Sequence, residues 1–145
     1  MFSIKVCFPD NFILNFSVPT VKIGVKREHG ENYLDITTHG ATLDAVKYLM
    51  DMGHRKIAFI SEPCVSVKVE RFRNSMKKCM LPIRDEYIVI SEKRFEDGGY
   101  DCMEQLLALD EPPTAVIAAY DYMALGALDC IEKHGLSVPD DISLI

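Results

Sequence analysis

The chain has 145 residues and a formal net charge of −6, because 22 acidic residues outnumber 16 lysines and arginines. This length suits one domain, or one lobe of a two-lobed protein, and can bury roughly two-thirds of its unfolded surface, so folding requires no metal or disulfide. A surface that binds nucleic acid needs clustered cations to neutralise phosphates. The acidic balance therefore argues against DNA contact by these residues.

The cysteine pattern favours reduced thiols in a cytosolic protein, because the five cysteines are odd in number and widely spaced. We recognise no C-x-x-C pair and no zinc-ligand spacing, and we expect neither a metal site nor a cofactor. The first 16 residues lack the positive start and unbroken apolar stretch of a signal peptide. No segment approaches the roughly 18 apolar residues needed to cross a membrane. We therefore expect a cytoplasmic protein.

Predicted strands and helices alternate along the chain. In chain order, β-branched or aromatic runs predict strands at 4–8, 21–25, 57–60, 87–90, 115–119 and 142–145, with a further short strand indicated at 34–36. Patterns of helical period predict helices at 40–52, 66–80, 97–109 and 121–134. This alternation implies βαβ crossovers. The expected fold is α/β, a three-layer parallel sheet with helices on both faces.

The ends of these helices have local causes. Ser66 and Asp121 are N-cap types, whose side chains accept from the free N–H groups of a first turn. Gly53 and Gly135 follow helical patterns and can take the left-handed conformation that ends a helix.

Two of the helices are predicted to be covered differently. The helix at 66–80 carries one apolar stripe, formed by Val69, Phe72, Met76 and Cys79, and should lie on the sheet with its other side wet. The helix at 121–134 is apolar on two sides, with Leu125 widening one of them. We expect another lobe or a second subunit on its second side; the alternative is that all of it is internal core. Gly126 inside this helix suggests that something packs close there.

Ligands in an open parallel sheet lie beyond the carboxyl ends of the strands. The residues that follow three strands are hydroxyls, carboxylates, guanidiniums and rings: Ser61, Glu62, Arg71, Ser91, Glu92, Arg94, Phe95, Tyr120 and Asp121. This mixture suits a small polyhydroxylated ligand. Each member also has a plainer reading: Asp121 as a helix cap, Arg71 as a solvated charge, and Glu92 and Arg94 as ordinary loop charges.

The usual enzymatic signals are not found. No G-x-G-x-x-G, G-x-x-x-x-G-K-[ST] or G-x-S-x-G motif occurs, and the four histidines are scattered along the chain, each beside a glycine. We therefore expect no catalytic residue and no enzyme.

Three separated blocks of the chain carry recognisable motifs. Residues 40–60 contain GHRKI between a helix and a strand, residues 113–128 join a strand to a helix through Tyr120-Asp121, and residues 135–145 read GLSVPDDISLI. In order and spacing these blocks resemble the lactose-repressor/galactose-repressor (LacI/GalR) family of transcriptional regulators, and the similarity covers roughly residues 18 to 145.

The resemblance implies a periplasmic-binding-protein-like fold of type I, in which two lobes close over a sugar, nucleoside or related metabolite. In that frame, residues 1–33 end the N-terminal lobe and 34–145 form most of the C-terminal lobe, truncated at its C-terminus. The DNA-binding head would lie outside this chain. The expected function is effector sensing and dimerisation within a bacterial regulator. The alternatives are a solute-binding receptor of a sugar transport system with the same fold and a metabolic α/β enzyme.

The resemblance also implies roles for individual residues. Arg71 matches an effector-contacting arginine in the pattern S-x-x-x-R-x-x-G, although Val67 and Asn74 replace its hydroxyl and its glycine. Tyr120 stands where the family often has Asn, and Asp121 matches the Asp after it. Phe95 or Arg94 falls near the family's stacking side chain, and Ser61 is a further candidate for effector contact because it directly follows a predicted strand. The resemblance also implies a homodimer interface on two helices, formed by Tyr100, Met103, Leu107, Leu125 and Leu128.

Overall fold

The computed structural model describes residues 22–23, 33–34, 40–63 and 66–145. The chain divides into two compact units, Met1–His39 and Gly40–Ile145. In the smaller unit, β1 (Lys22–Ile23) pairs in parallel with β2 (Tyr33–Leu34). The predicted strand at 4–8 lies outside the described residues. The predicted lobe boundary at 33–34 falls within β2 and stays a prediction.

The larger unit repeats a strand-and-helix alternation, as predicted. Its elements are α1 (Ala41–Asp51), β3 (Ile57–Ser61), α2 (Ser66–Lys78), the 3-10 turn η2 (Asp85–Tyr87), β4 (Ile88–Ile90), α3 (Phe95–Leu107), β5 (Ala115–Ala118), α4 (Asp121–Lys133) and β6 (Ser143–Leu144). In the described part of the chain, no helix is long and apolar enough to cross a membrane.

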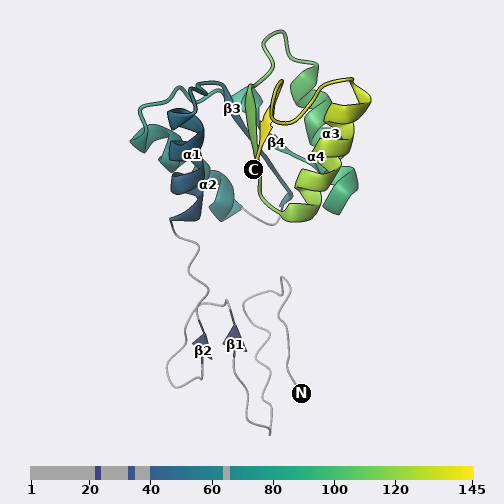
Figure 1. The fold of residues 1–145 in the computed structure, drawn as a ribbon. Helices are drawn as coiled ribbons and strands as arrows, with labels where there is room; N and C mark the ends of the chain where they lie inside the picture. The colour runs from purple at the N-terminus through teal and green to yellow at the C-terminus, as the bar shows by residue number, and fades with distance from the viewer. Residues whose placement is uncertain (1–21, 24–32, 35–39, 64–65) are drawn as a thin grey trace, which may run out of the picture. The chain divides into compact units, whose positions relative to one another are not determined.

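The four strands of the larger unit form one parallel sheet in the order β4-β3-β5-β6. In the register, Phe59 lies opposite Ile88 on one side and opposite Ile117 on the other. Helices α1 and α2 cover one face of the sheet, and α3 and α4 cover the other (Figure 1). The predicted three-layer α/β arrangement is therefore confirmed.

β3 shows why the sheet needs two helical layers. Its five residues are all buried, and successive side chains point to opposite faces. Ile57 and Phe59 pack with α1 and α2, where the Phe59 ring stacks on Phe72 at 5.1 Å between centroids. Ala58 and Ile60 pack with α3 and α4. Apolar residues alternate onto both faces from Ile57 to Ile60, and such a strand is stable only when both faces are covered.

Two helix ends follow the sequence prediction and two helix starts do not. Gly53 (φ 97°) and Gly135 (φ 73°) take the left-handed conformation just after α1 and α4. α4, however, has Tyr120 at its N-cap, and Asp121 is already inside the first turn, where its carboxylate accepts the Tyr122 N–H at 3.0 Å. α3 begins at Phe95, two residues before the predicted start.

α3 and α4 pack backbone against backbone. A Cβ atom on Gly126 would lie 1.9 Å from the Glu96 carbonyl oxygen, and one on Gly99 would lie 1.9 Å from that of Met123. The close neighbour predicted at Gly126 is therefore α3 of the same chain. The second apolar side of α4 is therefore covered in part by α3 of the same chain.

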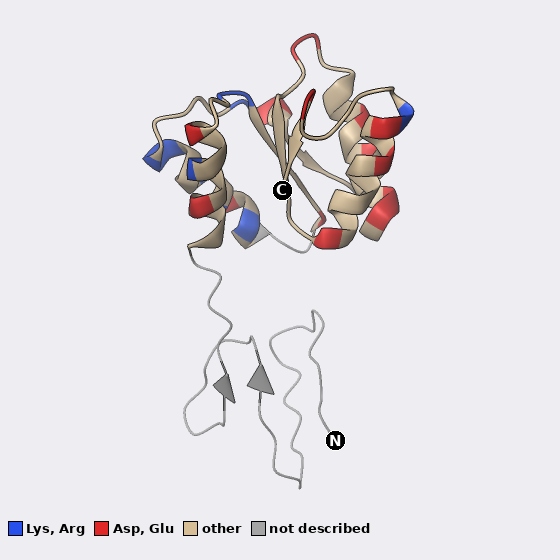
Figure 2. Ribbon diagram, viewed as in Figure 1, with Lys and Arg blue, Asp and Glu red and all other residues tan. Residues whose placement is uncertain are grey.

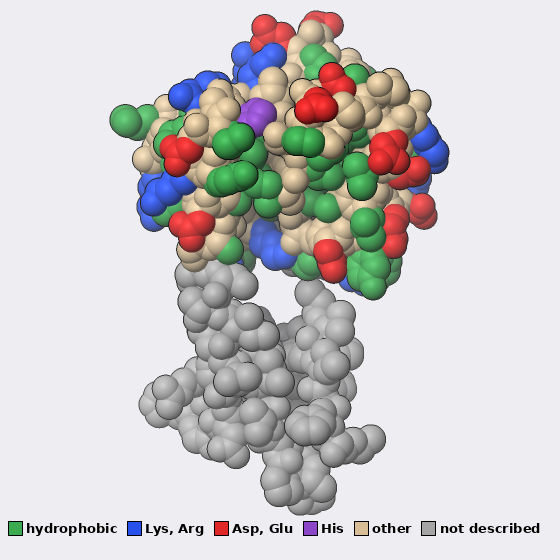
Figure 3. Space-filling view, viewed as in Figure 1, with side chains coloured by type: hydrophobic (Ala, Val, Ile, Leu, Met, Phe, Trp, Pro, Cys, Tyr) green, Lys and Arg blue, Asp and Glu red, His purple; other side chains and the backbone are tan. Residues whose placement is uncertain are grey.

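Charge is divided between the two helical layers. α2 carries five basic residues and one acidic residue, whereas α3 and α4 together carry seven acidic residues and one lysine. Figure 2 shows this division, with red concentrated on α3 and α4. On the face seen in Figure 3, apolar side chains lie over α1 and α4 and are interspersed with charged ones.

Candidate functional site

The carboxyl ends of β3 and β5 form the topological switch point of the sheet. These strands are neighbours, but the chain leaves β3 for α2 on one face and leaves β5 for α4 on the other. Open parallel sheets bind ligands at the point where neighbouring strands send their connections to opposite faces. We call the residues that follow β3, β4 and β5 at this edge the switch-point cluster.

Lys68 connects α2 to the residues that follow β5. It lies on α2, and its ammonium donates a hydrogen bond to the carbonyl oxygen of Ala119, at the end of β5. The same nitrogen sits 3.6 Å from the centroid of the Tyr120 ring, a cation–π contact. Burial lowers the pKa of Lys68, and the positive charge of Arg71 lowers it further, whereas Glu62 and Asp121 oppose this. Two cations and two carboxylates thus interact across the end of the sheet.

A buried carboxylate joins the loops after β3 and β4. Glu62 accepts a hydrogen bond from Arg94 Nε at 2.9 Å, with the Glu62 side chain 7% exposed and that of Arg94 57% exposed. A carboxylate so deeply buried is costly without a cationic partner. The pair leaves the rest of the Arg94 guanidinium at the surface, where its carbon lies 4.8 Å from the Phe95 ring centroid.

Two aromatic side chains continue the cluster onto α3 and α4. Phe95 is 48% exposed and has a positive φ of 57°, a conformation that is strained for a bulky residue. Its ring meets that of Tyr122 edge to face, with 5.8 Å between centroids. Strain of this kind persists only where the surroundings hold it, and it is common at ligand sites.

Most of the predicted site residues come together here, and one does not fit. Arg94, Phe95, Tyr120 and Asp121 reach the surface at this edge, and Arg71 is half-buried on α2. Ser61 is fully buried, and its hydroxyl donates to the Glu62 carbonyl oxygen at 3.3 Å. The prediction that Ser61 contacts a ligand is therefore not supported, because Ser61 is the last residue of β3 and its side chain belongs to the interior.

The cluster has two further members that the sequence analysis does not predict, Lys68 and Tyr122. Lys68 falls outside the apolar stripe of its helix, so the pattern alone predicts a solvated side chain there. The signal for Lys68 was its position three residues before Arg71, since residues three apart lie on the same face of a helix. No comparable signal pointed to Tyr122, whose contact depends on where α3 begins.

The predicted dimer residues divide by burial. Leu125 is 55% exposed, and Tyr100, Leu107 and Leu128 are partly buried. The side chain of Met103 is fully buried in the core between the sheet and the α3–α4 layer. The prediction that Met103 contacts a second subunit is therefore not supported.

The larger unit is similar to proteins of known family. Residues 46–145 match the periplasmic binding protein-like domain family. The chain is 40% identical over 110 residues to catabolite control protein A of Priestia megaterium, and the match covers 72% of this chain and 33% of that protein. A regulatory protein of the LacI family from Chloroflexus aggregans has 28% identity and a TM-score of 0.76, over 87% of this chain and 47% of that one.

A ligand-bound structure shows the same likeness. The LacI family transcriptional regulator from Lactobacillus casei, solved with bound glucose, has a TM-score of 0.74 and 25% identity, and the match covers 86% of this chain and 49% of that one. The chain spans about a third of the length of the curated relatives it matches. The predicted type of fold is confirmed. The chain belongs to the periplasmic binding protein-like domain family, in its lactose-repressor/galactose-repressor branch.

Proposed function

We propose that this chain is an effector-sensing and dimerising module of a bacterial DNA-binding transcriptional regulator, and that it has no enzymatic role. The effector is a sugar, a nucleoside or a related metabolite. The observation that carries the proposal is the switch-point cluster, which gathers Lys68, Arg94, Tyr120 and Asp121 at the edge of the sheet where this fold class binds ligands.

The chemistry of the cluster suits a hydroxyl-rich ring. Carboxylate oxygens of Asp121 accept from hydroxyls, and the Arg71 and Arg94 guanidiniums donate to ring and hydroxyl oxygens. The partly exposed rings of Phe95 and Tyr122 offer apolar surface for the face of a sugar or a base. The Glu62–Arg94 ion pair holds the guanidinium in place before a ligand arrives, which reduces the entropy lost on binding.

The relatives favour a regulator over a transport receptor, because the curated proteins are named as repressors and a catabolite control protein. In this proposal the regulator is cytoplasmic and contacts DNA through a head outside this chain, not through these acidic residues. The effector binds more tightly to one arrangement of the two lobes. Its binding therefore changes the fraction of molecules that are competent to bind DNA.

Titration calorimetry with three probes, glucose, ribose and adenosine, tests the site. At least one probe is expected to bind the protein, and Asp121→Asn is expected to weaken it roughly 10- to 100-fold, the cost of losing a hydrogen bond to a charged group. Asp129→Asn is the matched control, since Asp129 lies on the same helix but pairs with Lys133 at 2.8 Å. Equal losses in both variants, or no binding of any probe, would contradict the proposal.

Dimerisation is proposed on the α3–α4 layer, where Leu125 is 55% exposed and Leu128 lies beside it, partly buried. Two apolar side chains one helical turn apart form the kind of surface that a second copy can cover. Tyr100, Leu107 and Leu128, which are partly buried, complete this surface, and Met103 does not belong to it.

A further inference from the structure

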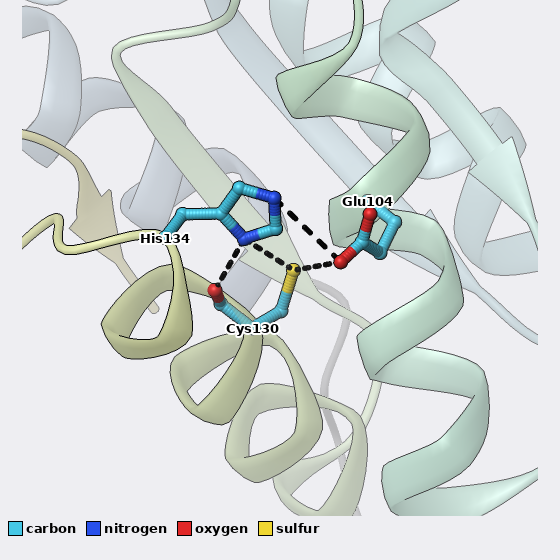
Figure 4. A group of neighbouring side chains, drawn as sticks. All are labelled: Glu104, Cys130 and His134. Atoms are coloured by element: carbon cyan, nitrogen blue, oxygen red, sulfur yellow. Dashed lines mark hydrogen bonds and ion pairs between the residues drawn. The ribbon is translucent and has the colours of Figure 1, made fainter.

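Three side chains capable of binding a metal meet between α3 and α4. Glu104 comes from α3, Cys130 comes from α4, and His134 is the C-cap of α4, four residues on and therefore on the same side as Cys130. Their ligand atoms all lie within 4.8 Å of one another. Figure 4 shows the carboxylate, the sulfur and the imidazole pointing toward a common space. The proposed function makes no use of this group.

The imidazole of His134 keeps one nitrogen available as a metal ligand. Its Nδ1 lies 2.9 Å from the backbone oxygen of Cys130. A carbonyl oxygen can only accept, so Nδ1 carries the proton and Nε2 keeps its lone pair. Nε2 is also the ring nitrogen that lies 3.7 Å from Glu104 Oε1. Ligating histidines usually donate their other N–H in this way, and this second contact fixes the ring.

The spacing of the group fits a tetrahedral ion. With zinc bonds of about 2.3 Å to sulfur and about 2.0 to 2.2 Å to nitrogen and oxygen, two ligands of one ion lie roughly 3.3 to 3.6 Å apart. Here Cys130 Sγ lies 3.7 Å from Glu104 Oε1, and that oxygen lies 3.7 Å from His134 Nε2. A contraction of a few tenths of an ångström closes the first two edges of the tetrahedron. On the third edge, Cys130 Sγ lies 3.8 Å from His134 Nδ1, so the imidazole must turn for sulfur and Nε2 to bind the same ion.

The chemistry of the three ligands indicates which class of ion they bind, and their exposure allows the ion to enter from solvent. Sulfur and imidazole favour a borderline ion such as Zn²⁺, whereas Mg²⁺ and Ca²⁺ prefer oxygen alone. The side chains of His134 and Glu104 are 39% and 44% exposed, so an ion can reach them from solvent and a water can complete its coordination. Cys130 is fully buried beneath them.

We propose that Glu104, Cys130 and His134 bind one zinc-type divalent cation, which links α3 to α4. On binding, the Cys130 thiol gives its proton to solvent and the thiolate bonds to the ion. The site goes beyond effector sensing, and it overturns our expectation from sequence that no metal site exists. That expectation missed the pair Cys130 and His134, because the spacing of four residues on one helix is not that of a zinc finger.

Cobalt titration of the purified protein tests the site, since Co²⁺ replaces Zn²⁺ and reports its ligands by colour. The protein is expected to bind Co²⁺ with a sulfur-to-cobalt charge-transfer absorption and the intense visible bands of tetrahedral cobalt, and Zn²⁺ is expected to displace it. Glu104→Gln and His134→Gln change exposed groups and should leave the fold intact. Each is expected to weaken binding by more than the roughly 10- to 100-fold that loss of an outer-shell partner costs.

The controls separate this group from other ligands in the chain. Glu132→Gln alters an exposed carboxylate on α4 outside the group, and Cys79→Ser alters a half-buried thiol on α2. Both should bind Co²⁺ as the unaltered protein does, whereas Cys130→Ser should lose the charge-transfer absorption. The proposal is overturned if the unaltered protein binds no Co²⁺, or if Glu104→Gln and His134→Gln bind it with unchanged affinity.

Discussion

Cys102 illustrates how burial controls a single side chain. Its thiol is fully buried beneath the sheet, and burial raises its pKa to about 11, although contacts with the backbone of Ser61 and Ser91 oppose the rise. Cys79 is half-buried near the end of α2. Both are free thiols, as the sequence predicted, but only one is open to reagents.

A thiol-reactive disulfide reagent should therefore modify Cys79 well before Cys102 in the native protein at pH 8. Only the thiolate reacts, and at three pH units below its pKa roughly one Cys102 in a thousand is ionised. Its rate should rise about tenfold for each unit of pH up to the pKa, because a raised pKa means ionisation only at high pH. Peptide mass spectrometry after timed quenching measures both rates. Faster labelling of Cys102 would show that the α3–α4 layer opens readily.

At this scale the sequence predicted residue types better than residue positions. Tyr120 and Asp121 could be expected at the sheet edge because they come within three residues of the end of β5, and Arg94 because it lies in the loop between β4 and α3. Ser61 and Met103 could not, because one residue along a strand or a helix decides between interior and surface. Lys68 was misjudged for a related reason: its apolar stem and charged head are placed by Tyr120, which lies 52 residues along the chain.

At the scale of helices and strands, the contact between α3 and α4 has an unusual requirement. Alanine at a helix-interior glycine normally adds about 1 kcal/mol of stability. Gly126→Ala should do the reverse, because its Cβ would meet the Glu96 carbonyl oxygen at 1.9 Å and neither backbone can rotate away. We expect a loss of about 2 kcal/mol or more in the free energy of unfolding, within the range for overpacked cores.

Urea denaturation measures this loss, and Gly40→Ala is its control. Among the described residues, a Cβ at Gly40 would meet only Asp44 Oδ2, at an ordinary 3.5 Å, and its φ of −94° suits any residue. That variant should lose at most about 1 kcal/mol, the typical cost of alanine at an N-cap. If Gly126→Ala were as stable as Gly40→Ala, the two helices would lie farther apart than they do here.

The order of elements could be predicted, whereas the order of strands in the sheet could not. Buried apolar runs such as Ile57–Ser61 and glycines at helix ends are local signals, so β3, β5 and the ends of α1 and α4 followed from sequence. The order β4-β3-β5-β6 depends on which strands the crossovers bring together, which no local pattern encodes. The start of α3 was missed because Phe95 adopts a positive φ that its residue type disfavours.

At the scale of the whole molecule, the uneven charge distribution bears on self-association. If two copies pair through α3 and α4, layers with a large excess of acidic residues approach each other. Screening by salt reduces this repulsion, so association should strengthen as ionic strength rises. Sedimentation velocity at low and at high salt measures the effect.

Leu125→Asp should abolish this association, since it adds a charge to the surface proposed to be covered. Met80→Asp is the matched control, because Met80 is 92% exposed just after α2, on the other layer. A folded monomer for the first variant and a dimer for the second are expected. Two dimers, or an unaltered protein that is monomeric at every salt concentration, would remove the α3–α4 layer as the interface.

The glycine contacts also determine how the layer can move. Gly99 and Gly126 bring two backbones together without an intervening layer of side chains, so no rotamer change can absorb a displacement of one helix against the other. α3 and α4 must therefore shift as one rigid body. Their first turns hold Phe95 and Tyr122, and their last turns hold Glu104 and His134. A displacement of Phe95 or Tyr122 at the sheet edge would therefore also displace Glu104 and His134 at the other end of the helix pair.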